Sequence, residues 1–110
     1  MKTPYKAVEF IITNAPFYAL AKSERIFLEE FRKTKKALLM KDAMVAGFDS
    51  AASQEREAYA HPDYKKVLDG LAAAIEKEET LKWQLTAAQM KAEIWRTESA
   101  NERMEGKSTQ

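Results

Sequence analysis

Five basic side chains stand within ten residues in the first half of the chain, and no acidic residue stands among them. These residues, here called the basic run, are Arg32, Lys33, Lys35, Lys36 and Lys41. Residues three or four apart share one side of a helix, so Arg32, Lys33 and Lys36 are spaced to contact successive phosphates of a nucleic acid, or an acidic protein. The alternative interpretation is a solvated helix end, because the helix dipole favours cations near a C-terminus.

Residue types that carry catalysis are scarce in this chain. His61 is the only histidine, and it precedes a proline, where capping of a helix end is the ordinary explanation. There is no cysteine, which excludes disulfides, thiolate zinc sites and cysteine nucleophiles. Glu76 and Glu79 form an E-x-x-E pair that, with Glu29 or Glu30, would suit Mg²⁺ in an all-α hydrolase. A Glu-rich helix produces such pairs by chance, so we expect no catalytic residue, no metal ligand and no cofactor.

Composition sets the broad class of the protein. The 110 residues are 45% hydrophobic, which predicts one domain over residues 1–104, and the polar segment 105–110 is expected to be a disordered tail. A net charge of +1 excludes a whole-protein field that would attract nucleic acid or anionic lipid. No apolar segment is long enough to span a membrane, and the lack of cysteine fits a reducing cytoplasm.

The few prolines and glycines indicate where helices begin and end. Pro16 suits the first turn of a helix, and Gly47 suits the position just after a helix. Asp49 or Ser50 can cap the next helix, which His61 and the following proline close. The sequence therefore predicts four helices and no strand, at residues 4–12, 16–46, 50–60 and 63–104.

Apolar residues at three-and-four spacing predict that the two long helices pack together as an antiparallel hairpin, either bundle-like or coiled-coil-like. In the helix at 16–46, the expected packing face consists of Phe17, Leu20, Ala21, Glu24, Phe27, Leu28, Phe31, Leu38 and Val45. In the helix at 63–104, it consists of Val67, Leu71, Ala74, Glu78, Leu81, Leu85, Ala88, Ala92 and Trp95. The acidic residues Glu24 and Glu78 fall within these faces. A cationic neighbour, Arg25 or Lys82, or a position at the boundary of the face would offset the cost of burying their carboxylates.

A second apolar stripe lies on the helix at 63–104, about 200° around the helix from the packing face. It consists of Trp83, Ala87, Met90 and Ile94. One alternative is that the short helix at 4–12 covers it. The other is that it stays exposed and either docks a partner or forms a homodimer, which we expect through Trp83, Met90 and Ile94 because a short helix covers little of a long one.

Three blocks of the sequence carry a resemblance to a known group of proteins. They are YALAKSERIFLEEFRKTKKALLMKDA at 18–43, SQEREAYAHPDY at 53–64 and LKWQLTAAQMKAEIWRTESANERM at 81–104. The chain resembles short all-helical proteins that tailed phages encode in the early region near recombination and replication genes. The features that carry the resemblance are the order of the three blocks, the RKTKK run, and the E-x-W-R segment with Glu93, Trp95 and Arg96. The resemblance implies a phage protein that acts in the cytoplasm of a bacterial host.

Together these observations lead to three functional hypotheses. The favoured one is a non-enzymatic phage accessory protein of DNA recombination or replication, which binds DNA or a phage or host DNA-metabolism protein through the basic run and the second stripe. The first alternative is an inhibitor or modulator of a host bacterial protein, with the helical hairpin docked on an enzyme surface. The third is a Mg²⁺-dependent all-α hydrolase that uses Glu76 and Glu79.

Overall fold

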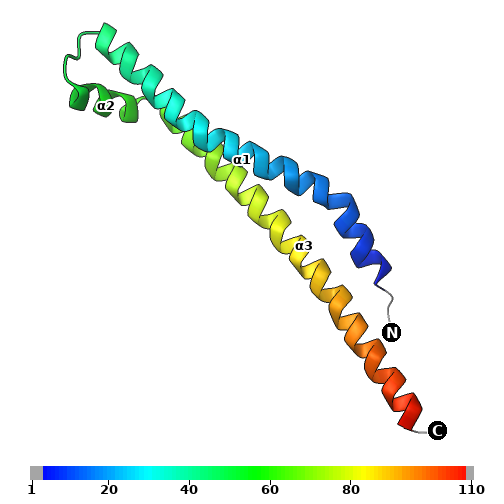
Figure 1. The fold of residues 1–110 in the computed structure, drawn as a ribbon. Coiled ribbons are helices and arrows are strands. Elements are labelled where there is room, and N and C mark those ends of the chain that lie inside the picture. Colours follow the sequence, from blue (N-terminus) through cyan, green and yellow to red (C-terminus); the bar gives the residue numbers. More distant parts are fainter. Residues whose placement is uncertain (1–3, 109–110) are drawn as a thin grey trace. The chain divides into compact units, whose positions relative to one another are not determined.

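The computed structural model describes residues 4–108, and it confirms the all-α fold (Figure 1). Three helices, α1 (Tyr5–Val45), α2 (Ala51–Ala60) and α3 (Pro62–Ser108), contain nearly all of these residues, and none of them forms a strand. Within the same range, no helix combines the length and the apolar character that crossing a bilayer would require.

The prediction of separate helices at 4–12 and 16–46 is wrong, because α1 is continuous through Pro16. A proline inside a helix removes one backbone donor and costs about 3 kcal/mol. Ending one helix and starting another would leave four carbonyls and four N–H groups without helical partners, which costs more than one lost donor. Asn14, one of the expected caps, instead donates from its side-chain amide to the carbonyl of Phe10 at 2.9 Å, one turn back.

The predicted helix ends between α1 and α3 are confirmed. Gly47 has a φ of +107°, and the amide of Phe48 donates to the carbonyl of Ala43, which completes the end of α1. Ser50 caps α2, and its hydroxyl accepts from the Ser53 amide at 3.1 Å in a capping box. His61 ends α2, and its Nδ1 accepts from the amide of Asp63 at the start of α3.

The far end of α3 differs from the expected one. The helix continues to Ser108, four residues beyond the predicted end at residue 104. The segment expected to be a polar tail therefore lies partly within α3, and its last two residues fall outside the described range. Its glutamate and lysine are good helix formers, which favours this continuation.

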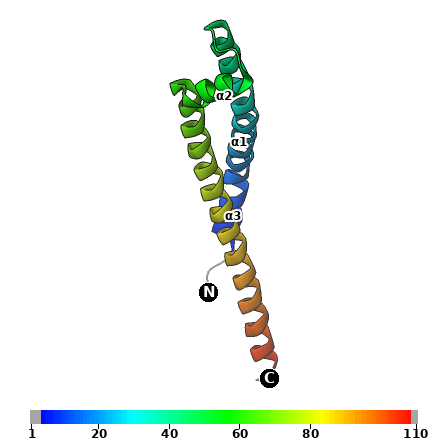
Figure 2. The ribbon, with the colours of Figure 1, turned by 90° about the vertical axis from the view of Figure 1, so that its left-hand side faces the viewer.

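The described residues group into two compact units, of which one contains Leu20–Glu78. In this unit, α1 and the first part of α3 are antiparallel, since Glu24 pairs with Lys77 near one end and Lys35 pairs with Asp63 near the other. Figure 2 shows α2 between the C-terminal end of α1 and the N-terminal end of α3. This arrangement is the expected antiparallel hairpin.

The core of this unit is thin. Its buried hydrophobic residues are Ala21, Leu39, Ala43, Ala58, Leu71 and Ala74, so only two of them are larger than alanine. On α3 the predicted packing face is confirmed, because Leu71, Ala74 and Glu78 are buried and Val67 is half-buried. The close approach that alanine side chains permit brings the two helices together with few large apolar groups between them.

On α1 the predicted packing face is only partly right, because Ala21 is buried and Leu28 half-buried as expected, whereas most of the large apolar residues one position before the packing residues are exposed. Between residues 21 and 39, the side of α1 that packs follows a seven-residue repeat, and we call this set the packed seam: Ala21, Arg25, Leu28, Arg32, Lys35 and Leu39. Five apolar residues expected in the packing face are exposed, with relative surface areas of 55% for Phe17, 52% for Leu20, 63% for Phe27, 50% for Leu38 and 79% for Val45. Glu78 supplies the physical reason, because Arg25 satisfies its buried carboxylate, whereas Phe27 at that place would not.

The other unit contains residues 4–19 of α1 and 79–108 of α3. The predicted packing face of α3 is confirmed here too, with Ala88 buried and Leu81, Leu85, Ala92 and Trp95 half-buried. A shallow hollow in this unit is lined by Pro4 and Val8 together with α3 residues around Trp95.

Candidate interaction surfaces

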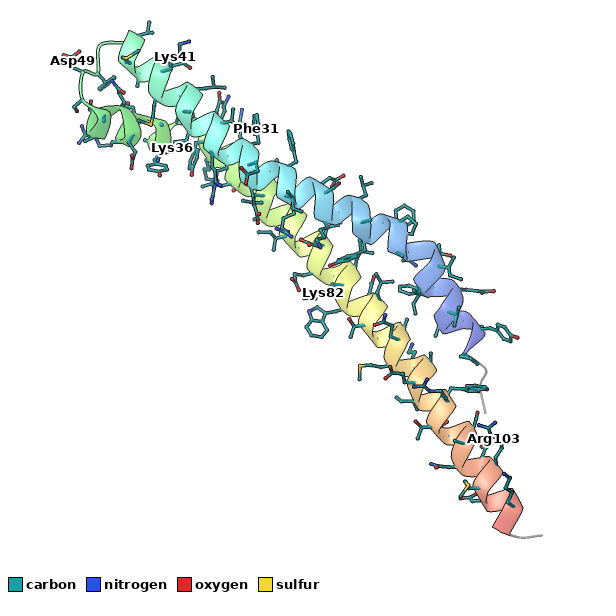
Figure 3. All side chains as sticks on the ribbon, in the orientation of Figure 1. Phe31, Lys36, Lys41, Asp49, Lys82 and Arg103 are labelled. Carbon is teal, nitrogen blue, oxygen red and sulfur yellow. The ribbon has the colours of Figure 1, made fainter. Side chains whose placement is uncertain are left out.

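Lys36 is the residue of the basic run with the most contacts inside the protein. Its Nζ lies 4.6 Å from the centre of the Tyr59 ring and 3.5 Å from a carboxylate oxygen of Glu55, both on α2. The Tyr59 side chain, and after it Glu55, raise the pKa of Lys36 above its ordinary value. Figure 3 shows Lys36 beside α2. This side chain therefore connects α1 to α2, through a cation–π contact and an ion pair.

Two further lysines of the basic run also have acidic partners. The Nζ of Lys35 lies 3.7 Å from Asp63 at the start of α3, and Lys33 donates to Glu30 at 3.4 Å. The Lys35 side chain is about one quarter exposed, so this cation is turned toward the protein. The structure therefore does not present the basic run as one uniform cationic face.

Arg32 and Lys41 complete the basic run. Arg32 is half-buried in the packed seam, and Lys41 is exposed on the last turns of α1 (Figure 3). Neither has an ion pair with any residue between 4 and 108. Lys41 is thus the one lysine of the basic run that is exposed without an ion-pair partner in the described part of the chain.

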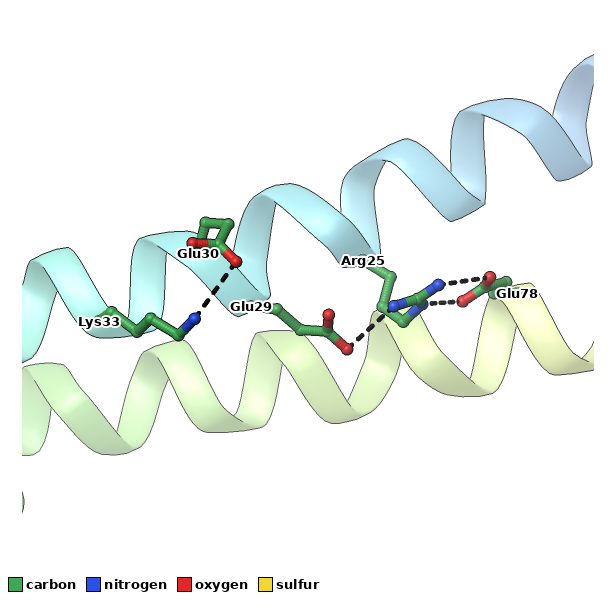
Figure 4. Close-up of polar contacts among 5 residues, drawn as sticks. All are labelled: Arg25, Glu29, Glu30, Lys33 and Glu78. Atoms are coloured by element: carbon green, nitrogen blue, oxygen red, sulfur yellow. Dashed lines mark hydrogen bonds and ion pairs between the residues drawn. The ribbon is translucent and has the colours of Figure 1, made fainter.

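A polar network crosses the helix pair at Arg25 (Figure 4). Its Nε and Nη2 donate to the two carboxylate oxygens of Glu78, the latter at 3.1 Å, and its Nη1 donates to Glu29 at 3.0 Å. Glu78 is 7% exposed, and its hydrogen bonds, followed by those of Glu29, raise the pKa of Arg25 above its ordinary value. Of the partners considered from the sequence, Arg25 is the one that relieves Glu78, and the arrangement fixes the register of the helices.

The acidic residues considered for Mg²⁺ are engaged elsewhere or stand apart. Glu29 bonds to Arg25, and Glu30 pairs with Lys33 on the surface of α1 (Figure 4). Glu76 and Glu79 are both exposed on α3. Between residues 4 and 108 there is no group of three acidic or histidine side chains that could hold a metal ion.

The second stripe of α3 is exposed. Trp83, Met90 and Ile94 have relative surface areas of 63%, 56% and 54%, and Ala87 between them is exposed as well. Residues 4–12 do not cover this stripe, so the first of the two alternatives for it is not realised. The buried Ala88 lies on the other side of the helix, which leaves the stripe facing away from the packed side of α3.

The E-x-W-R segment of α3 lies in the same unit as this stripe. Trp95 is half-buried and, with Arg96, Ser99, Glu102 and Arg103, lines a shallow open hollow. Two arginines and one glutamate line it, so the hollow carries charges of both signs.

α1 carries a separate surface that was not predicted from the sequence. A second seven-residue repeat, here called the outer seam, runs one residue before the packed seam and consists of Leu20, Glu24, Phe27, Phe31, Thr34, Leu38, Lys41 and Val45. The rings of Phe27 and Phe31 are stacked, with centres 5.7 Å apart and planes 13° apart. The spacing of the apolar residues contains this second repeat. The prediction from the sequence merged two repeats, one residue apart, into a single broad face.

No protein-family model, curated protein or solved structure shows a significant match to this chain.

Proposed function

We propose that the protein acts by binding another protein, as a non-enzymatic accessory of phage DNA recombination or replication. The observation that carries this proposal is the exposed stripe of Trp83, Met90 and Ile94 on α3. Tryptophan and methionine are enriched in the cores of protein interfaces, and adjacent exposed apolar side chains mark docking surfaces. The phage setting and the bacterial cytoplasm rest on the resemblance carried by residues 18–43, 53–64 and 81–104.

A protein partner is favoured over direct contact with DNA by the state of the basic run. Lys33, Lys35 and Lys36 each have an acidic neighbour within 3.7 Å, and the net charge of the chain is only +1. Affinity for DNA depends on the number of phosphates that cations neutralise. With three of its lysines already paired, the basic run offers few cations for that purpose.

The function is tested by placing a photo-reactive amino acid at Met90, in bacteria that carry the phage early genes. We expect a covalent adduct with a DNA-processing protein, and we expect Ile94→Glu to abolish it because a carboxylate cannot enter an apolar contact. The matched control places the same amino acid at Gln84, which is also exposed on α3. Equal adducts from positions 84 and 90 would contradict the proposal.

Two other results would replace this proposal by an alternative stated from the sequence. An adduct with a host enzyme outside DNA metabolism would favour an inhibitor or modulator of that enzyme. An adduct with only a second copy of this chain would assign the stripe to self-association.

A further inference from the structure

The outer seam of α1 is more apolar than the seam that packs inside the protein. Five of its eight residues are large and apolar, and only Glu24 and Lys41 are charged. In the packed seam, three of six residues are charged. Leu20, Phe27, Leu38 and Val45 are exposed and Phe31 is half-buried. A helix normally turns its most apolar side inward, so a largely exposed seam of this kind indicates a surface that another helix covers.

We propose that a second copy of this chain covers the outer seam, with the two α1 helices antiparallel and centred between residues 32 and 33. In an antiparallel helix pair with this repeat, each layer joins one residue of the seam to another at the mirrored position. The apolar layers join Leu20 to Val45, Phe27 to Leu38 and Phe31 to Thr34. The remaining layer joins Glu24 of one copy to Lys41 of the other.

The charges of the outer seam select this arrangement. In the proposed register, each of its two charged residues faces the opposite charge. Moving the register by one heptad places Lys41 opposite Phe31 in one direction, or Glu24 opposite Thr34 in the other. A parallel pair would place Glu24 against Glu24 and Lys41 against Lys41, and such like-charge contacts are strongly unfavourable.

The area of the surface is sufficient for a specific dimer. The outer seam from Leu20 to Val45 is about 39 Å long at 1.5 Å per residue. The Nζ atom of Lys77 lies 3.9 Å from a carboxylate oxygen of Glu24, so the side of α3 that carries Lys77 adjoins the seam. Gly70, seven residues earlier, lies on that same side of α3. There is open space beside the Cα atom of Gly70, so α3 is not crowded at this point beside the seam. A face about two helices wide then buries roughly 600 Å² per copy, at the lower end of stable interfaces.

The proposal is tested by charge reversal, with mass measured by light scattering during size-exclusion chromatography. We expect the wild-type chain to show about twice its mass of 12.6 kDa at tens of micromolar. Glu24→Lys and Lys41→Glu should each weaken the dimer by about 100-fold or more, because each reversal creates two like-charge pairs in a symmetric dimer. The double variant Glu24→Lys with Lys41→Glu should restore it.

Two controls separate the interface from local effects. Lys77→Gln removes the ion pair that Glu24 makes within the chain, and Lys33→Glu reverses an exposed charge outside the outer seam; both should remain dimeric. A monomeric wild-type chain, or a double variant no more dimeric than the single ones, would overturn the proposal. A dimer that Trp83→Glu with Ile94→Glu dissociates, but Glu24→Lys does not, would also overturn it. None of these measurements depends on the partner adduct at Met90, so the two proposals fail separately.

Discussion

Arg25 on α1 and Glu78 on α3 form a bidentate contact in which the guanidinium donates to both carboxylate oxygens. The carboxylate is almost entirely buried, and Ala21 and Ala74 pack nearby on the same faces of the two helices. A buried carboxylate requires such partners, because removing a charge from water is costly. This pair therefore decides which side of α1 faces α3, and it leaves most of the more apolar outer seam exposed.

The first prediction concerns this contact. Arg25→Met should lower the melting temperature clearly more than Glu29→Gln does, because the former removes both hydrogen bonds from the buried Glu78 carboxylate. Replacing both Arg25 and Glu78 by leucine should recover most of the loss, since no buried charge then remains. Equal effects of Arg25→Met and Glu29→Gln would show that the contact does not determine stability.

The second prediction compares two adjacent leucines. Leu39 is buried and Leu38 is half exposed, so Leu39→Ala should lower the free energy of unfolding by about 2–5 kcal/mol. Leu38→Ala and Phe27→Ala should instead weaken self-association, which appears as a loss of stability that depends on protein concentration. Denaturant titrations at two protein concentrations separate these effects. If Phe27→Ala lowered the free energy of unfolding as much as Leu39→Ala, independently of protein concentration, Phe27 would pack inside the chain as predicted from the sequence.

The third prediction concerns Lys36 and pH. Because its pKa is raised in the folded protein, its stabilising effect is fully present below the ordinary lysine value of 10.5 and is lost as pH rises through the raised value. Lys36→Met should therefore be less stable than wild type near pH 8, and the difference should shrink above about pH 10.5. Melting curves across this range provide the measurement, with Lys33→Met as the control. A difference that stays constant to strongly alkaline pH would mean that the charge of Lys36 contributes nothing.

The fourth prediction concerns the start of α2. Ser50→Ala removes the hydroxyl that accepts from the Ser53 amide, and it should lower stability by about 1 kcal/mol. Hydrogen exchange should accelerate at the first amides of α2 more than at those in the middle of α3. Unchanged exchange at residues 51–54 would show that the capping box does not hold this helix.

The sequence predicted α3 better than α1, for a physical reason. Along α3, the buried Leu71, Ala74 and Ala88 follow one repeat, whereas the large residues Trp83 and Met90 lie far around the helix from it. On α1, two repeats differ by one residue, and apolarity alone merged them into one broad face that included both Ala21 and Phe27. The actual choice depends on a long-range pair between residues 25 and 78, which no local pattern contains.

The helix boundaries and the candidate sites show the same division between local and long-range effects. Gly47, Ser50 and His61 act through local geometry, and their roles were predicted from their positions in the sequence. Pro16 was expected to begin a helix, but its local cost is smaller than that of two additional helix ends. The pairing of Lys35 and Lys36 with residues of α2 and α3 depends on the folded hairpin, so the basic run could be found from the sequence but its neutralisation could not.

The central claim, that the outer seam of α1 joins two antiparallel copies of the chain, is tested most directly by distances between spin labels. The chain has no cysteine, so Lys33→Cys and Ser23→Cys each carry a single label, at exposed positions that directly precede the seam residues Thr34 and Glu24 in the sequence. The proposed register places the two copies of residue 33 about 1.5 Å apart along the helix axis, and those of residue 23 about 28 Å apart. Pulsed electron spin resonance should therefore give a short distance between copies for the first variant and a long one for the second. Equal short distances at both positions, as in a parallel pair, or no distance between copies at either position, would contradict the claim.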